Sequence, residues 1–251
     1  MVTPVDYTKR MVELIEVAGG TVENDLFVTR PGCLLIANTI LTGAGKDLVE
    51  RLHILDRPEY EQMAELNARL TYLSFRREGE PGDLYLHKLA REHQHLSVFS
   101  QATATFLLAG VSVETSMELI AHGEAKVARL TTSKTRAMDH PLFRLQGSAA
   151  SQAAQRRQIQ SALDAMVGSK PEEREFANIN NPGSKATALT YAMNLKDYHT
   201  LFIGRLPEAG NETEVREICY RMCQQLHAIY PLVIRHPDEY AAMGNGDKYG
   251  S

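Results

Sequence analysis

Two segments of the chain contain the polar side chains best suited to chemistry. The first runs from Glu118 to Thr135 and combines His122 with hydroxyl and basic residues, and the second runs from Pro182 to Arg205. Hydroxyl and cationic groups in so short a stretch could form a local pocket for a phosphate. By residue type alone, a histidine at a helix end is more often a capping or packing residue, and a basic loop is more often a solvated surface.

Helices and strands are expected to position both segments. A helix with an apolar inward stripe begins at Ser112 or Glu114 and ends near His122. The second segment is predicted to start as a strand over residues 186–193, after which Asn194 caps a helix. Both segments therefore contain a helix end, where polar groups become accessible.

The rest of the chain alternates between helical and extended patterns. Apolar spacing predicts helices over residues 5–18, 57–76, 84–92 and 149–167 and a strand over residues 97–108. The clearest helix begins with a capping-box pattern at Asn211 and Glu214, whereas the tail after Pro237 is rich in glycine and is expected to fray. This mixture predicts an α/β or α+β fold in which helices pack on a largely antiparallel sheet.

Composition restricts the class of protein. The 251 residues are 43% hydrophobic and 23% charged, which is enough for one compact domain or two closely joined ones, and a single domain with insertions is expected. The net charge of −4 gives no basic footprint, so nucleic acid is not expected as a partner. We find neither an apolar run long enough to cross a bilayer nor a signal-peptide pattern, so we expect a cytoplasmic protein with no membrane contact.

Three cysteines, Cys33, Cys219 and Cys223, cannot form a disulfide framework. Cys219 and Cys223 lie four residues apart in one predicted helix, a spacing that could supply half of a metal site. No further ligands accompany them in the sequence, so no metal site is predicted and all three are interpreted as small core residues.

The first segment and the residues before it resemble a diagnostic block of the flavin-dependent thymidylate synthases, the ThyX family. In that family a Gly-His-x-Thr element precedes a helix that ends in Arg-His-Arg, and a loop with a serine and an arginine follows. The chain keeps this spacing with His95 and Ser97, with the stretch from Glu118 to Gly123, and with the loop from Ala128 to Lys134.

The second segment is similar to the family's second block. Asn194 and Lys196 stand in place of Asn-x-Arg, and Arg205 follows at the same interval. Two independent blocks in the right order make the match specific, and it covers roughly residues 55–235.

The resemblance implies a ThyX-like fold of the α/β (α+β) class, with a central, largely antiparallel sheet and packed helices. It divides a single domain of residues 1–251 into a divergent N-terminal helical region (1–54), a core shared with the family (55–235) and a frayed tail (236–251). The family forms a homotetramer whose sites lie where subunits meet, so the same assembly is expected here. FAD is the implied cofactor, with NADPH and methylenetetrahydrofolate as co-substrates.

Individual roles follow from the matching positions. Arg205 matches the arginine that holds the pyrimidine ring of deoxyuridylate, and Thr131 matches a serine beside the substrate, so both are expected to be catalytic. The implied FAD contacts are Ser97, His122, Asn194 and Lys196. The implied substrate contacts are Glu118, Thr131, Thr132, Ser133, Lys134 and Arg205.

Several positions depart from the family pattern. Ala121, Gly123, Ser133 and Asn178 stand where the family has arginines, and Arg129 stands where it often has an acidic residue. Each lost contact between a guanidinium and a phosphate is worth about 1.5–3 kcal/mol.

The leading hypothesis is a thymidylate synthase or a close derivative that transfers a one-carbon unit from methylenetetrahydrofolate to a uracil nucleotide, with reduced FAD as the hydride source. Two alternatives stay open. One is a flavin enzyme retargeted to another heterocyclic substrate, and the other is a catalytically silent assembly protein. For an enzyme, the expected partner is a small molecule, either a nucleotide or a related heterocycle.

Overall fold

The computed structural model describes residues 6–23, 28–54, 58–74, 83–122, 124–130, 142–145, 147–166, 184–207 and 213–243. The chain forms two compact units, each assembled from three segments. Unit 1 comprises Met1–Leu34, Leu107–Tyr191 and Glu212–Val215, and unit 2 comprises Leu35–Phe106, Ala192–Asn211 and Arg216–Ser251. That the whole chain acts as a single domain stays a prediction.

One mixed sheet contains the strands of the described residues. They are β1 (Thr21–Glu23), β2 (Val28–Arg30), β3 (Gly32–Asn38), β4 (Thr103–Ser112), β5 (Lys126–Arg129), β6 (Phe143–Arg144) and β7 (Ser184–Asn194). Their order is β1-β2-β6-β7-β4-β3, and β5 also pairs with β7. The pairs β1–β2 and β6–β7 are antiparallel, whereas β2 and β6 are parallel.

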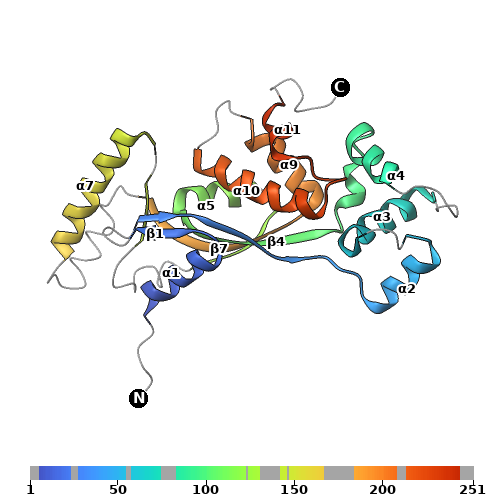
Figure 1. Ribbon diagram of the computed structural model, residues 1–251, viewed down its shortest axis with the longest axis horizontal. Helices are drawn as coiled ribbons and strands as arrows, with labels where there is room; N and C mark the ends of the chain where they lie inside the picture. Colours follow the sequence, from blue (N-terminus) through green and yellow to red (C-terminus); the bar gives the residue numbers. More distant parts are fainter. Residues whose placement is uncertain are drawn as a thin grey trace, which may run out of the picture. The chain divides into compact units, whose positions relative to one another are not determined.

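Helices pack on this sheet (Figure 1), which confirms the mixed α/β fold that the sequence predicts. The helices of the described residues are α1 (Tyr7–Val17), α2 (Gly43–Arg51), α3 (Glu59–Tyr72), α4 (Asp83–His87), α5 (Val113–Ile120), α7 (Ala149–Met166), α9 (Leu195–Arg205), α10 (Thr213–Ile229) and α11 (Pro237–Ala241). A π-helical turn, η1 (Lys88–Glu92), follows α4, and a 3₁₀ turn, η2 (Leu96–Phe99), precedes β4. The helices predicted around α1, α3, α4 and α7 are therefore present.

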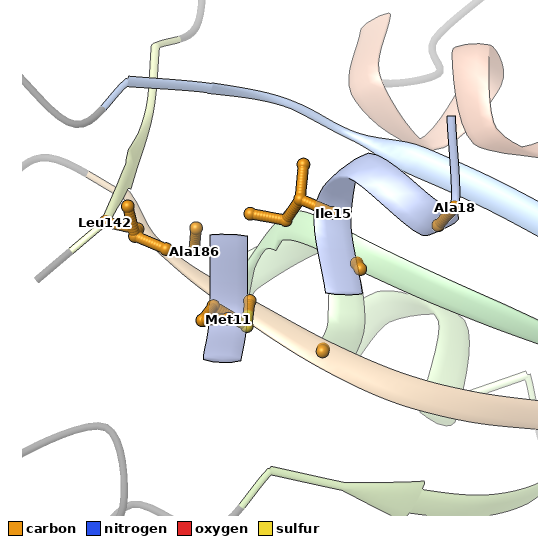
Figure 2. Packing of buried hydrophobic residues seen from close by; sticks show 7 residues of the cluster. Met11, Ile15, Ala18, Leu142 and Ala186 are labelled. Carbon is orange, nitrogen blue, oxygen red and sulfur yellow. The ribbon is translucent and has the colours of Figure 1, made fainter. Parts of the chain in front are cut away.

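In unit 1, α1 packs its apolar face against β4 and β7. Asp6 begins the helix, because its side chain accepts a hydrogen bond from the Lys9 amide (2.9 Å). Met11 and Ile15 lie one helical turn apart and are buried among small residues (Figure 2). The full cluster contains Met11, Ile15, Ala18, Ala109, Leu142, Ala186 and Ala188. Alanine on the strands leaves room for the larger side chains of α1.

The strand predicted over residues 97–108 begins later than expected. It starts at Thr103, and Ser97 lies in η2 instead. Val98 and Phe99 are both buried, with 4% and 0% exposure. Consecutive side chains of a strand point to opposite faces, so a strand with one solvated face would expose one of the two, whereas a helical turn can bury both.

The N-terminal region, which the sequence predicts to be helical, also contains strands. Residues 1–54 contain β1, β2 and β3 in addition to α1 and α2. Two of these strands, β1 and β2, have three residues each. Such short segments do not show a recognisable alternation of apolar and polar residues, so their pairing depends on the rest of the sheet.

The C-terminal tail also differs from the frayed segment that the sequence predicts. Its first part forms α11, with Pro237 at the start and reciprocal capping between His236 and Glu239. Tyr240 is fully buried, and its hydroxyl oxygen lies 2.6 Å from Nδ1 of His199 on α9. Burial of one aromatic side chain anchors the helix, and the glycines that suggested fraying lie beyond it.

This buried contact predicts a pH dependence of stability. Burial lowers the pKa of His199 to about 4, and the charges of Arg235 and Arg91 act in the same direction. The unfolded chain takes up a proton near the ordinary histidine pKa of 6.5, whereas the folded protein does so only near 4. Stability is therefore fully present above about pH 6.5, and about 3 kcal/mol is lost as the pH falls to about 4.

Urea unfolding between pH 7.5 and 4.5 measures this effect. Replacement of His199 by Gln removes the titrating group, so the variant should lose less stability over the same pH range than the wild type. Equal losses in both proteins would mean that other groups cause the pH dependence.

The cysteines behave as the sequence analysis predicts. Cys33, Cys219 and Cys223 are all buried, and none of the three forms a disulfide. Burial raises the pKa of the Cys223 thiol, which keeps it protonated and unreactive. Among the described residues there is no group of three or more side chains that could hold a metal ion. A search of the same residues finds no helix with the length and apolar character of a membrane span.

Candidate functional site

Six of the predicted site residues belong to the described part of the chain. Unit 1 contains Glu118 on α5 and His122 directly after it. Unit 2 contains Ser97 in η2, Asn194 before α9, and Lys196 and Arg205 on α9. The other four predicted positions, Thr131, Thr132, Ser133 and Lys134, lie outside the described residues. Of the departures from the family pattern, Gly123, Ser133 and Asn178 also lie outside them.

In unit 1, α5 determines where His122 lies. Ser112 caps the helix, because its hydroxyl oxygen accepts a hydrogen bond from the Thr115 amide (3.0 Å). At the other end, the hydroxyl of Tyr191 on β7 donates to the Leu119 carbonyl (3.1 Å). His122 follows the helix and is half-buried. The predicted helix end is confirmed, and the contact of His122 with FAD stays a prediction.

A buried carboxylate holds the start of α5. Glu214, at the beginning of α10, is 4% exposed. It accepts hydrogen bonds from the Ser112 amide (3.0 Å) and the Thr115 hydroxyl (2.9 Å). Arg144 of β6 forms an ion pair with the same carboxylate (3.3 Å) and donates to the Thr29 carbonyl (3.4 Å). Parts of β2, β4, α5, β6 and α10 are thus joined by one polar network.

Sequence reasoning missed this network. It assigned Glu214 to a capping box with Asn211, which lies outside the described residues. The partners of Glu214 on α5 are separated from it by about a hundred residues, 102 for Ser112 and 99 for Thr115. No local pattern reveals such a pairing, although an acidic residue in an otherwise apolar helix stripe is a weak signal for a buried carboxylate.

In the same unit, β5 places Arg129 against α5. The amide of Leu130 donates to the Ala188 carbonyl of β7 (2.9 Å), which holds the end of β5 on the sheet. Nη1 of Arg129 lies 3.2 Å from Oγ of Ser116 and 3.0 Å from Sδ of Met117. The guanidinium therefore lies beside the helix that carries Glu118.

In unit 2, Asn194 is a helix cap. Its Oδ1 accepts a hydrogen bond from the Asp197 amide (2.9 Å), and its Nδ2 donates to the Asp197 carboxylate (2.7 Å). The Leu195 amide donates to the Ala102 carbonyl (2.9 Å), which joins α9 to the residues before β4. The cap predicted from the sequence is confirmed. A contact of this side chain with FAD stays a prediction and would have to share or replace the bonds to Asp197.

Lys196 and Ser97 present exposed polar groups on two elements that pack together, α9 and η2. Lys196 lies in the first turn of α9, and its ammonium group makes no ion pair within the described residues. The helix dipole does not stabilise a cation there, so a bound anion beside the ammonium group would be favoured. These two side chains suit a phosphate group.

Arg205 ends α9 and is half-buried. Because an α-helix rises 1.5 Å per residue, it lies about 14 Å along the axis from Lys196. Lys196, predicted to contact FAD, and Arg205, predicted to contact the pyrimidine, therefore lie at opposite ends of α9. The catalytic role of Arg205 stays a prediction.

The structure adds an aromatic group near Ser97 that the sequence analysis did not assign. The rings of Tyr72 and His95 are stacked, with centroids 5.5 Å apart, and the Tyr72 hydroxyl oxygen lies 3.0 Å from His95 Nδ1. The ring of His93 lies 5.7 Å from that of His95. The spacing of the two histidines is visible in the sequence, but their neighbour Tyr72 is distant in the chain and appears only in the fold.

The sequence profile described as thymidylate synthase complementing protein matches residues 53–232. Because the match covers well over half of the chain, the protein belongs to this family, also called ThyX. No curated protein matches the chain significantly.

Solved structures of this class share the fold. ThyX from Helicobacter pylori with FAD and dUMP is 14% identical, with a TM-score of 0.58, and the match covers 85% of this chain and 100% of that chain. Another structure of ThyX from Helicobacter pylori, complexed with FAD and dUMP, is 14% identical, with a TM-score of 0.55 and coverage of 81% of this chain and 97% of that chain. The UMP/dUMP methylase PolB from Streptomyces cacaoi, bound with 5-Br UMP, is 14% identical, with a TM-score of 0.56 and coverage of 84% and 95%.

Proposed function

We propose that this protein is a flavin-dependent thymidylate synthase or a close derivative of one. Its reaction transfers a one-carbon unit from methylenetetrahydrofolate to a uracil nucleotide, deoxyuridylate in the simplest case, and yields thymidylate. Membership of the ThyX family over residues 53–232 is the observation that carries the proposal. Structures of the same fold contain FAD with dUMP, or a brominated UMP, which supports a flavin and a uracil nucleotide as ligands.

The described residues fit FAD in part. Lys196 and Ser97 offer an exposed cation and hydroxyl on packed elements, as a phosphate of the cofactor requires. His122 is half-buried at the end of α5, where an imidazole can contact a polar ring. The amide of Asn194 is engaged by Asp197, so it contributes by shaping the helix start. When bound and reduced, FAD would supply the hydride that completes the methyl group, and the chain contributes binding and orientation.

The assembly and co-substrates belong to the same proposal. NADPH reduces the flavin, and methylenetetrahydrofolate donates the carbon. In a homotetramer the sites lie where subunits meet, so a second copy of the chain contributes residues to each site. The protein acts in the cytoplasm.

Replacement of Lys196 by Gln tests the cofactor site. We expect FAD affinity to fall about tenfold, because a charge-assisted contact with a phosphate is replaced by a neutral one. Quenching of FAD fluorescence on titration with protein measures the dissociation constant. Lys9→Gln, which removes an exposed cation from α1, is the matched control and should bind FAD like the wild type. Equal affinities for FAD in both variants would exclude Lys196 from the cofactor site.

A retargeted flavin enzyme is the second candidate. Ala121 is the C-cap of α5 and stands directly before His122, where the family has an arginine. That position belongs to the implied cofactor contacts. The loss of arginines at the two phosphate positions, Ser133 and Asn178, with His122, Asn194 and Arg205 retained, favours a substrate without a phosphate. The third candidate is a catalytically silent assembly protein. This hypothesis predicts that the protein takes up no flavin.

Visible spectroscopy separates these functions. The purified protein is incubated with FAD, freed of excess cofactor, and titrated with deoxyuridylate. A flavin spectrum that shifts with deoxyuridylate supports the synthase. A flavin spectrum that does not respond favours the retargeted enzyme, and a colourless protein overturns both and leaves the assembly role.

A further inference from the structure

The guanidinium of Arg129 has only uncharged partners. Its Nη1 contacts Oγ of Ser116 (3.2 Å) and Sδ of Met117 (3.0 Å). Within the part of the chain that the structure describes, Nε and Nη2 make no hydrogen bond, and no carboxylate forms an ion pair with the group. The side chain is nevertheless half-buried.

An arginine in this setting favours an anionic partner. Partial removal of a permanent charge from water costs free energy, which is regained when an anion accepts the remaining N–H groups. The two bonds of Nη1 hold the plane of the guanidinium beside α5. Within the described residues, the edge formed by Nε and Nη2 is left without an acceptor. The parallel N–H bonds of this edge match two oxygens of one phosphate or carboxylate.

The place of Arg129 in unit 1 relates it to the proposed site. Its two contacts, Ser116 and Met117, directly precede Glu118 on α5. The backbone is held by the bond from Leu130 to the Ala188 carbonyl, so the position of the side chain is defined by β5 and α5 together. Along the chain, Arg129 comes just before the hydroxyl residues 131–133 that the sequence assigns to the substrate.

We infer that Arg129 binds the phosphate of the nucleotide substrate. This inference rests on the proposed function, because that function names the nucleotide. Arg129 supplies the guanidinium that is absent at Ser133, from a neighbouring position in the same segment. It is a specificity-determining residue, and it selects a nucleoside monophosphate over the corresponding nucleoside.

Binding of three probes to the full-length protein tests the inference. The probes are deoxyuridine 5′-monophosphate, deoxyuridine and inorganic phosphate, and affinities are measured by calorimetry with thermal shift as a second readout. Arg129→Gln keeps an N–H donor for Ser116 but removes the charge, and Arg129→Lys keeps the charge without the bidentate edge. Lys126→Gln, an exposed cation on the same strand, is the control for net charge.

In Arg129→Gln we expect the affinity for the monophosphate to fall about 10- to 100-fold, while the affinity for deoxyuridine is unchanged. Arg129→Lys should lie between this variant and the wild type, and Lys126→Gln should match the wild type. Inorganic phosphate should raise the melting temperature of the wild type but not that of Arg129→Gln. A similar melting temperature of all four proteins without ligand shows that the variants fold.

Three results would overturn the inference. The first is unchanged affinity of Arg129→Gln for the monophosphate, and the second is an equal loss for deoxyuridine. The third is a smaller oligomer of Arg129→Gln with unchanged phosphate binding, which would identify a carboxylate of a second copy as the partner. A protein that takes up no FAD, yet binds phosphate through Arg129, would contradict the proposed function and leave the inference standing.

Discussion

Replacement of Glu214 by Ala should destabilise the protein by about 3–5 kcal/mol, because it removes one partner of a buried ion pair. The carboxylate is 4% exposed and accepts from the Ser112 amide, the Thr115 hydroxyl and Arg144. Its loss leaves two donors and a mostly buried guanidinium without this acceptor. Urea unfolding followed by far-ultraviolet circular dichroism measures the change in the free energy of unfolding.

Glu217→Ala is the matched control on the same helix. Glu217 pairs with Arg221 at 2.7 Å, but both side chains are about one third exposed. A pair of this kind contributes only about 0.3–0.5 kcal/mol. Similar losses in the two variants would mean that burial of the Glu214 network contributes little.

The Glu214 network also supports the helix that positions His122, a predicted FAD contact. The network holds the N-cap of α5, and α5 leads to His122. Glu214→Gln keeps the shape of the side chain and one acceptor oxygen, so it should lose less stability than Glu214→Ala.

Replacement of Tyr240 by Ala should cost about 3–5 kcal/mol, the range for deletion of a large buried aromatic side chain. Tyr240 has no exposed surface, and its ring lies 5.3 Å from that of His199 and 5.7 Å from that of Phe202, both on α9. The deletion removes the main apolar anchor of α11. Thermal and urea unfolding measure the loss, and protease cleavage near residue 237 should become faster.

Tyr240→Phe separates packing from hydrogen bonding. It keeps the ring and removes the hydroxyl that meets His199 Nδ1, at an expected cost of about 1–3 kcal/mol. Tyr220→Ala is the control, because Tyr220 is 36% exposed and its hydroxyl bonds to Asp238 at the surface. A loss in Tyr240→Ala no larger than that in Tyr220→Ala would restore the interpretation of the C-terminal segment as frayed.

Local sequence patterns predicted elements whose cause is local. The helix from Val113 to Ile120 with its cap at Ser112, and the strand that leads to the cap at Asn194, appear where the sequence places them. An N-cap depends on a side chain and an amide three residues away, so residue order is sufficient to recognise it. The resemblance to the family depends on residue order in the same way, and the match over residues 53–232 confirms the family.

Two other predictions from local patterns, the start of a strand and the fraying of the C-terminal end, were less reliable. The short and β-branched residues from Ser97 onward predicted a strand, yet Ser97 to Phe99 lie in a 3₁₀ turn that buries both Val98 and Phe99. The glycine-rich end suggested a frayed tail, yet Tyr240 holds α11 in place. In both cases the competing interaction is with residues far along the chain, and a short window does not contain it.

The sequence by itself determined the family, the α/β class, the position of His122 at a helix end and the cap at Asn194, and it left Ser112 and Glu114 as alternatives for the start of α5. Only the tertiary structure decided the partners of the charged groups. It pairs Glu214 with Arg144 and the start of α5, and it places Arg129 beside Ser116 with an open edge. The physical reason is that helix starts and periodicities arise from neighbours in sequence, whereas a buried charge is stabilised by whichever groups the fold brings within a few ångströms.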